Sequence, residues 1–94
     1  MQLVAIGLDH ERAPVEVRER VAIPAARLKD AIGALADYVS NGIVLSTCNR
    51  TEVYTVVEHD PAESRKAVER FLSEYGHIAL DQLDPYLYTY QGDD

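Results

Sequence analysis

The only cysteine of the sequence, Cys48, lies in a short polar segment whose residue types suit nucleophilic chemistry. The thiolate is the reactive form of cysteine, and a guanidinium two residues further along, at Arg50, favours that form. The side chains of Ser46, Thr47 and Asn49 and the backbone amides of a tight turn are donors that stabilise an oxyanion. Spacing alone leaves two interpretations open: a catalytic thiol, or an inert small residue half-buried in a polar turn.

Three further polar side chains are candidates for a supporting role. His10 follows the first apolar run, where it is either a general base or a solvent-facing hydrogen-bonding residue. Arg18 and Arg50 carry the guanidinium that binds a carboxylate through two hydrogen bonds. Arg18 equally suits the solvated face of a short helix predicted for Val15–Val21. Glu52 either orients Arg50 or is simply exposed on a strand.

Four apolar or β-branched runs predict strands, and these strands place the polar segment at a turn. The predicted strands are Gln2–Leu8, Ile43–Leu45, Thr51–Glu58 and Tyr86–Gln91. The segment between the second and third strands is short enough for a hairpin connection, which puts Cys48 in an accessible turn. In the last strand Tyr86, Tyr88 and Tyr90 fall on one face by alternation.

Two longer helices are predicted by apolar residues at helical spacing and by their end signals. The first follows Pro24 and ends at Gly42. Its apolar face consists of Leu28, Ile32, Leu35 and Val39. The second begins with an Asp60 cap and Pro61 in its first turn, and it ends at Gly76. This order of elements predicts an α+β fold, the βαββαβ ferredoxin-like sandwich, with two helices on one face of a four-stranded antiparallel sheet.

The composition is that of one small acidic domain. The chain has 94 residues, of which 47% are hydrophobic and 27% charged, as in an ordinary globular domain. The formal net charge of −7 argues against a main nucleic-acid grip, because phosphate affinity comes from clustered Lys and Arg. One cysteine excludes an internal disulfide, and the sequence shows no metal-site pattern. Without a membrane-length apolar run or a signal-peptide pattern, we expect a cytoplasmic protein with no membrane partner.

Two blocks of the sequence carry a family resemblance. Residues 45–54, LSTCNRTEVY, closely resemble the signature of glutamyl-tRNA reductases, which is LSTCNRxE followed by an aliphatic residue and tyrosine. Residues 7–15, GLDHERAPV, with Arg18 shortly after them, resemble the first block of the same family. The similarity extends over essentially the whole chain. Asp9 stands where the family often has Asn or Ser, and Arg12 where Thr is frequent, so substrate contacts of those side chains are not carried over.

The resemblance implies that residues 1–94 are the N-terminal catalytic domain of such a reductase. Cys48 is then the catalytic nucleophile, whose thiolate attacks the ester between glutamate and tRNA and forms a thioester. NADPH reduces the thioester to glutamate-1-semialdehyde, the first committed intermediate of tetrapyrrole synthesis. The resemblance also places Thr47, Cys48, Asn49 and Arg50 in the wall of the substrate site, with Arg50 gripping a carboxylate of glutamate.

Other parts of the family's architecture are expected past Asp94. These are a block with a catalytic histidine, an NADPH-binding domain, and a helical domain that dimerises and holds tRNA. The sequence contains no glycine-rich nucleotide fingerprint, so we expect no residue of this chain to bind NADPH. The resemblance implies glutamyl-tRNA as the substrate and a homodimeric full-length enzyme, with glutamate-1-semialdehyde aminomutase as a candidate channelling partner.

Two other classes of function stay open on the sequence. Ferredoxin-like domains also serve as small-molecule-binding regulatory modules, and in such a module Cys48 would be dispensable. A stand-alone thiol hydrolase of activated esters would need its own base, for which His10 is the only plausible candidate. A reading frame that continues past Asp94 into a nucleotide-binding domain would favour the reductase.

Overall fold

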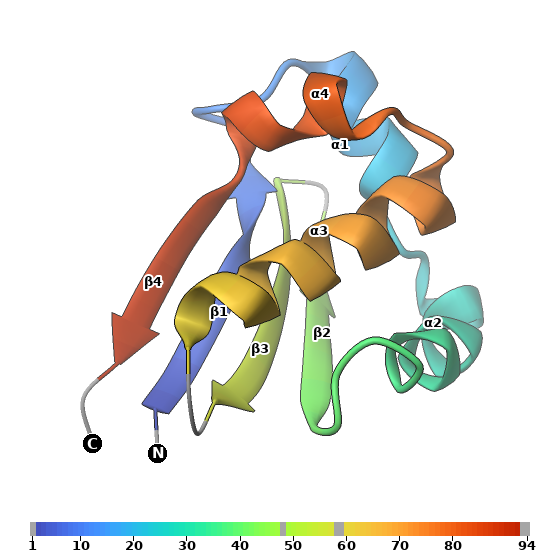
Figure 1. Ribbon diagram of the computed structural model, residues 1–94. Coiled ribbons are helices and arrows are strands. Elements are labelled where there is room, and N and C mark those ends of the chain that lie inside the picture. Colours follow the sequence, from blue (N-terminus) through green and yellow to red (C-terminus); the bar gives the residue numbers. More distant parts are fainter. Residues whose placement is uncertain (1, 48, 58–59, 93–94) are drawn as a thin grey trace.

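A four-stranded antiparallel sheet forms the centre of the protein. The structure is a computed structural model that describes residues 2–47, 49–57 and 60–92. Its strands are β1 Gln2–Asp9, β2 Gly42–Ser46, β3 Arg50–Val57 and β4 Tyr88–Gly92, in the spatial order β2-β3-β1-β4 (Figure 1). All neighbouring strands pair antiparallel. Four strands are present where the sequence predicts them, with shifted ends, and Glu58, the predicted end of the third, lies outside the described residues. Their order and directions are compatible with a ferredoxin-like sandwich.

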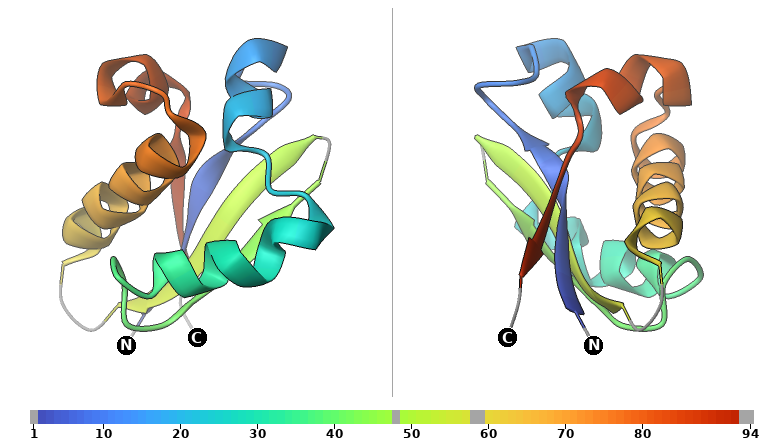
Figure 2. Two further views of the ribbon diagram at one scale, coloured as in Figure 1. Left: turned by 90° about the vertical axis from the view of Figure 1, so that its right-hand side faces the viewer. Right: turned by 60° about the vertical axis from the view of Figure 1, so that its left-hand side comes forward.

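The helices lie on one face and at one end of this sheet. They are α1 Val15–Val21, the 3₁₀ helix η1 Ala25–Arg27, α2 Leu28–Leu35, α3 Pro61–Gly76, α4 Leu80–Leu83 and the 3₁₀ helix η2 Asp84–Tyr86. Helices α2 and α3 cover one face, while α1 and α4 lie at the end where β1 finishes (Figures 1 and 2). Within the described ranges, no helix is long and apolar enough to cross a membrane.

Alternation along the central strand β1 separates a buried face from an open one. Val4, Ile6 and Leu8 are each fully buried and point toward the helices, where they pack with Phe71 and Leu35 in the hydrophobic core. Because side chains alternate in a strand, the residues between them belong to the opposite face, which no described helix covers. That opposite face is called the open face below. It carries the polar side chains of β3 and β4 that lie near the β2–β3 turn.

The first long helix is shorter than its apolar spacing predicts. Helix α2 ends at Leu35, and the chain continues in a turn in which Tyr38 donates its backbone N–H to the Leu35 carbonyl at 2.8 Å. Its buried positions are Ala31 and Leu35, whereas Ile32 is 39% exposed. The predicted end at Gly42 is wrong, because Gly42 already belongs to β2 and pairs with Thr55.

The predicted end of α3 at Gly76 is confirmed, whereas the predicted start of the last strand at Tyr86 is wrong. Gly76 is the last residue of α3, and the left-handed residue that follows it is His77, with φ of 53°. A Cβ at Gly76 would lie 2.6 Å from the Arg20 carbonyl oxygen, so this glycine permits close packing of α3 against α1. Tyr86 belongs to η2, which contains Pro85, rather than to the last strand. Tyr86 is therefore not part of the predicted tyrosine face of β4.

Candidate active site

The side chain of Thr47 organises the connection between β2 and β3. Its hydroxyl oxygen accepts hydrogen bonds from the backbone N–H groups of Asn49 and Arg50, both at 3.2 Å. The Thr47 N–H donates to the Arg50 carbonyl at 2.8 Å and closes the turn. These three amides are thus engaged inside the turn, which argues against their predicted use as oxyanion donors in this arrangement. Cys48, the predicted nucleophile, lies outside the described residues.

Ser46 fastens the end of β2 to the segment that follows α1. Its hydroxyl oxygen accepts the Ile23 backbone N–H at 2.9 Å and lies 3.2 Å from the Thr51 hydroxyl. A hollow of about 270 Å³ opens beside these contacts. The hollow is lined by Ala22, Ile23, Pro24, Ala25, Ser46 and Thr47. One side of the turn therefore borders a small cavity, and Ser46 acts as an anchor between two segments.

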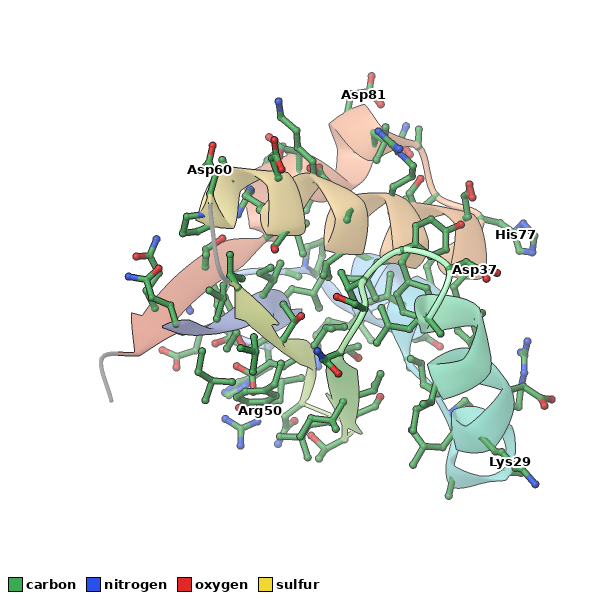
Figure 3. The ribbon with its side chains drawn as sticks, turned by 60° about the horizontal axis from the view of Figure 1, so that its bottom comes forward. Lys29, Asp37, Arg50, Asp60, His77 and Asp81 are labelled. Atoms are coloured by element: carbon green, nitrogen blue, oxygen red, sulfur yellow. The ribbon has the colours of Figure 1, made fainter. Side chains whose placement is uncertain are left out.

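Arg50 extends from the other side of the turn. Arg50 is the first residue of β3, and its side chain lies on the side of the sheet opposite α3 (Figure 3). That side chain is 51% exposed, and its Nε lies 3.7 Å from Oε1 of Glu52. A half-exposed guanidinium beside the turn is placed to receive an anion from solvent. Thr47 and Asn49 are exposed as well, so three of the four predicted substrate-wall residues are accessible.

The strand register brings the first sequence block to the same end of the sheet. Asp9 at the end of β1 is the Cα partner of Arg50 at the start of β3. His10 follows Asp9 directly and is exposed in the loop that Asp9 caps. The Asp9 carboxylate accepts the backbone N–H groups of Glu11 and Arg12, each at 3.1 Å. The antiparallel pairing of β1 with β3 therefore places the first block and Arg50 at the same end of the sheet.

The guanidinium of Arg18 contacts the loop that contains the first block. Its Nε donates to the Ala13 carbonyl at 3.2 Å, and the residue is partly buried. Arg12 lies over the open face, where it forms an ion pair with Asp9 at 3.0 Å and donates to the Tyr90 hydroxyl at 3.0 Å. Arg18 therefore helps to hold α1 against this loop and is only partly exposed on the helix face considered for it.

Sequence reasoning missed the buried carboxylate network on the open face. Glu52 is only 4% exposed, and its two oxygens accept hydrogen bonds from the hydroxyls of Tyr54 at 2.8 Å and Tyr88 at 2.6 Å. The hydrogen bond to Glu52, with burial, raises the pKa of Tyr54. Burial, with the hydrogen bond to Glu52, raises the pKa of Tyr88 far above its usual range. The interpretation of Glu52 as an exposed strand residue is therefore wrong. In the sequence, the only feature that indicated this network was Gly7, which pairs with Glu52 and leaves space beside it.

The described residues do not form a metal site. Among residues 2–47, 49–57 and 60–92, no group of three or more His, Cys, Asp or Glu side chains is arranged to hold a metal ion. The carboxylate of Glu52 is instead occupied by two tyrosine hydroxyls. The described polar groups near the turn include the hydroxyls of Ser46 and Thr47, the carboxylate of Glu52 and the guanidinium of Arg50.

The fold and the turn together define a ferredoxin-like domain with a polar hairpin turn at one end of its sheet. Comparison with known proteins shows the family to which this domain belongs. Residues 6–94 match the family model for the N-terminal domain of glutamyl-tRNA(Glu) reductase. Over the aligned residues, the chain is 40% identical to glutamyl-tRNA reductase of Herpetosiphon aurantiacus, 42% to that of Carboxydothermus hydrogenoformans and 43% to that of Crocosphaera subtropica.

The chain belongs to the glutamyl-tRNA reductase N-terminal domain family. The alignments cover 100%, 96% and 95% of this chain, in the order of the three organisms above, but only 22%, 20% and 21% of the relatives. The chain thus spans about a fifth of the length of the curated relatives that it matches. The family resemblance predicted from the two sequence blocks is confirmed.

Proposed function

We propose that this chain supplies the nucleophile of a glutamyl-tRNA reductase. The Cys48 thiolate attacks the carbonyl carbon of the ester that joins glutamate to the tRNA. A new S–C bond forms, the C–O bond to the ribose breaks, and the ribose oxygen leaves as a hydroxyl after taking a proton. The product on the enzyme is a glutamyl thioester at Cys48. The family match over residues 6–94, which include Cys48 between Thr47 and Asn49 in the sequence, carries this proposal.

The residues around Cys48 have separate roles in the proposed reaction. Thr47 shapes the turn through its two backbone hydrogen bonds. Arg50 binds a carboxylate of the glutamyl group, because a half-exposed guanidinium offers two parallel N–H donors. The exposed side chain of Asn49 completes the wall as a polar contact. His10 shares the sheet edge with Arg50, but we assign it no step.

Reduction to glutamate-1-semialdehyde requires a hydride donor, and the part of the chain that the structure describes around the turn does not favour one. The hollow beside the turn measures about 270 Å³, small for a dinucleotide, and the chain has a net charge of −7, which disfavours phosphates. We therefore assign NADPH to another part of the longer protein, where it supplies the hydride for the thioester. The same charge argues that the tRNA is held mainly outside these 94 residues.

Discharge of the tRNA without NADPH tests the proposed function. Full-length enzyme is mixed with tRNA that carries labelled glutamate, and free tRNA is measured against time. We expect a burst of one tRNA per active site, which disappears in Cys48→Ala and in Cys48→Ser. Continuous release of free glutamate by the wild type would point to a thiol hydrolase instead. An unchanged burst in Cys48→Ala would overturn the proposal.

A further inference from the structure

We propose that Tyr88 is a positioning residue that acts through Glu52 to hold the guanidinium of Arg50 in its substrate-binding orientation. The inference rests on the carboxylate-binding role proposed above for Arg50. Tyr88 belongs to β4 and Arg50 to β3, and β1 lies between these two strands. The proposal therefore connects a residue of the edge strand to the turn across the middle of the sheet.

The connection is possible because the residue between the two side chains is a glycine. Gly7 of β1 is the Cα partner of Glu52 on one side and of Tyr88 on the other. A Cβ at this position would lie 2.2 Å from the Thr51 carbonyl oxygen and 2.9 Å from the Glu52 Cγ. With no side chain at Gly7, the Tyr88 hydroxyl reaches over β1 and donates to Glu52 Oε2 at 2.6 Å.

The carboxylate of Glu52 is held at both of its oxygens. Tyr54 donates to Oε1 at 2.8 Å while Tyr88 donates to Oε2, and the residue is 4% exposed. A carboxylate that is buried in this way needs such donors, and two donors on different oxygens fix the plane of the group. Oε1 is also the oxygen that lies 3.7 Å from Arg50 Nε. Loss of the Tyr88 hydroxyl would free the carboxylate to rotate and would loosen its contact with Arg50.

The ring of Tyr88 is fixed by its own neighbours. The residue is 9% exposed, the Arg12 guanidinium lies 4.7 Å from its ring centroid, and the Tyr90 ring lies at 4.8 Å. Tyr90 is on the same face but is 53% exposed, and its hydroxyl accepts from Arg12 at 3.0 Å. Tyr90→Phe therefore removes a hydroxyl from the same strand and face but leaves both tyrosine hydrogen bonds of Glu52 in place, which makes it the matched control.

The test uses full-length enzyme and two charged tRNAs. The kcat/KM for glutamyl-tRNA is measured in Tyr88→Phe and Tyr90→Phe, and again with the same tRNA charged with glutamine. Because a hydrogen bond to a charged group is lost, we expect Tyr88→Phe to lower kcat/KM for glutamyl-tRNA roughly tenfold. The ratio of kcat/KM for the glutamate-charged tRNA to that for the glutamine-charged tRNA should also fall in Tyr88→Phe. In Tyr90→Phe both quantities should stay near their wild-type values. General destabilisation would lower kcat/KM for both charged tRNAs by the same factor. An unchanged preference for glutamate would therefore overturn the proposal.

A double-mutant cycle separates this proposal from the function on which it rests. If Tyr88 acts through Arg50, Tyr88→Phe should have little further effect in an Arg50→Lys background. Additive losses would show that Tyr88 acts elsewhere and would overturn the positioning role alone. If Arg50→Lys by itself has wild-type activity, the assigned role of Arg50 fails, and the positioning role fails with it. Glu52→Gln, which keeps the size of the side chain, serves as a second variant and should reproduce the Tyr88→Phe phenotype.

Discussion

At the scale of single residues, the β2–β3 turn divides its polar groups into two sets. The Thr47 hydroxyl is used inside the turn, where it accepts two backbone amides. Arg50 points outward on the open face, half exposed and next to Glu52. The sequence showed that the residues around Cys48 are polar and could bind a substrate. It did not predict which of them bond the turn itself and which face solvent. Whether a hydroxyl bonds its own backbone or a ligand depends on the turn's hydrogen bonds, which composition does not encode.

Substitution of Arg50 tests its role in substrate recognition. Arg50→Lys keeps the charge but loses the planar pair of donors, so we expect kcat/KM for glutamyl-tRNA to fall roughly a hundredfold. The reaction rate of Cys48 with iodoacetamide in full-length enzyme is the companion measurement. That rate should stay near wild type if Arg50 serves the substrate alone. If neither quantity changes, Arg50 is a bystander on the surface.

A pair of Thr47 variants tests whether its hydroxyl shapes the turn. Thr47→Val keeps the branched shape but removes the acceptor of two backbone N–H groups, so the neighbouring residues should shift. We expect turnover of glutamyl-tRNA to fall roughly tenfold or more, because small misplacements of reacting groups are costly. Thr47→Ser keeps the acceptor and should stay close to wild type. A loss in Thr47→Ser together with wild-type turnover in Thr47→Val would assign the effect to the methyl group instead.

At the scale of elements, the site depends on how three strands are placed side by side. The antiparallel pairing of β1 with β3 brings Asp9 to Arg50, and the glycine at position 7 lets β4 reach β3 through side chains. The sequence predicted the strands and their order because alternation and turn signals are local. It did not predict the Glu52 network, since that network joins residues 36 positions apart in the chain. The end of α2 at Leu35 was also missed, because a turn competes there with the apolar spacing.

Two glycine substitutions test the close approach at β1. In Gly7→Ala the new Cβ would meet backbone atoms, the nearest at 2.2 Å, so we expect a loss of about 1–3 kcal/mol in the free energy of unfolding. Gly33→Ala in α2 is the matched control, because nothing lies within 4 Å of its Cβ. That variant should gain about 0.5–1 kcal/mol, since alanine favours a helix over glycine. Urea unfolding of the 94-residue domain measures both, and equal stabilities would contradict the described register.

At the scale of the whole molecule, the domain is acidic and spans about a fifth of its relatives' length. Its fold class and family were predictable because the strand and helix signals agree with each other and two motif blocks sit in one chain. Under the proposed function, the cofactor and most of the tRNA are held outside these 94 residues. What these 94 residues contribute on this account is one chemical step, the transfer of glutamate from tRNA to Cys48.

Peptide mass spectrometry of that transfer is the most direct test of the account. Full-length enzyme is incubated with glutamyl-tRNA in the absence of NADPH, quenched in acid and digested. We expect a mass increase of one glutamyl group on the peptide that contains Cys48, sensitive to hydroxylamine as a thioester is, and lost when NADPH is added before the quench. A glutamyl group found on another residue, or aldehyde formed by Cys48→Ala at the wild-type rate, would contradict it.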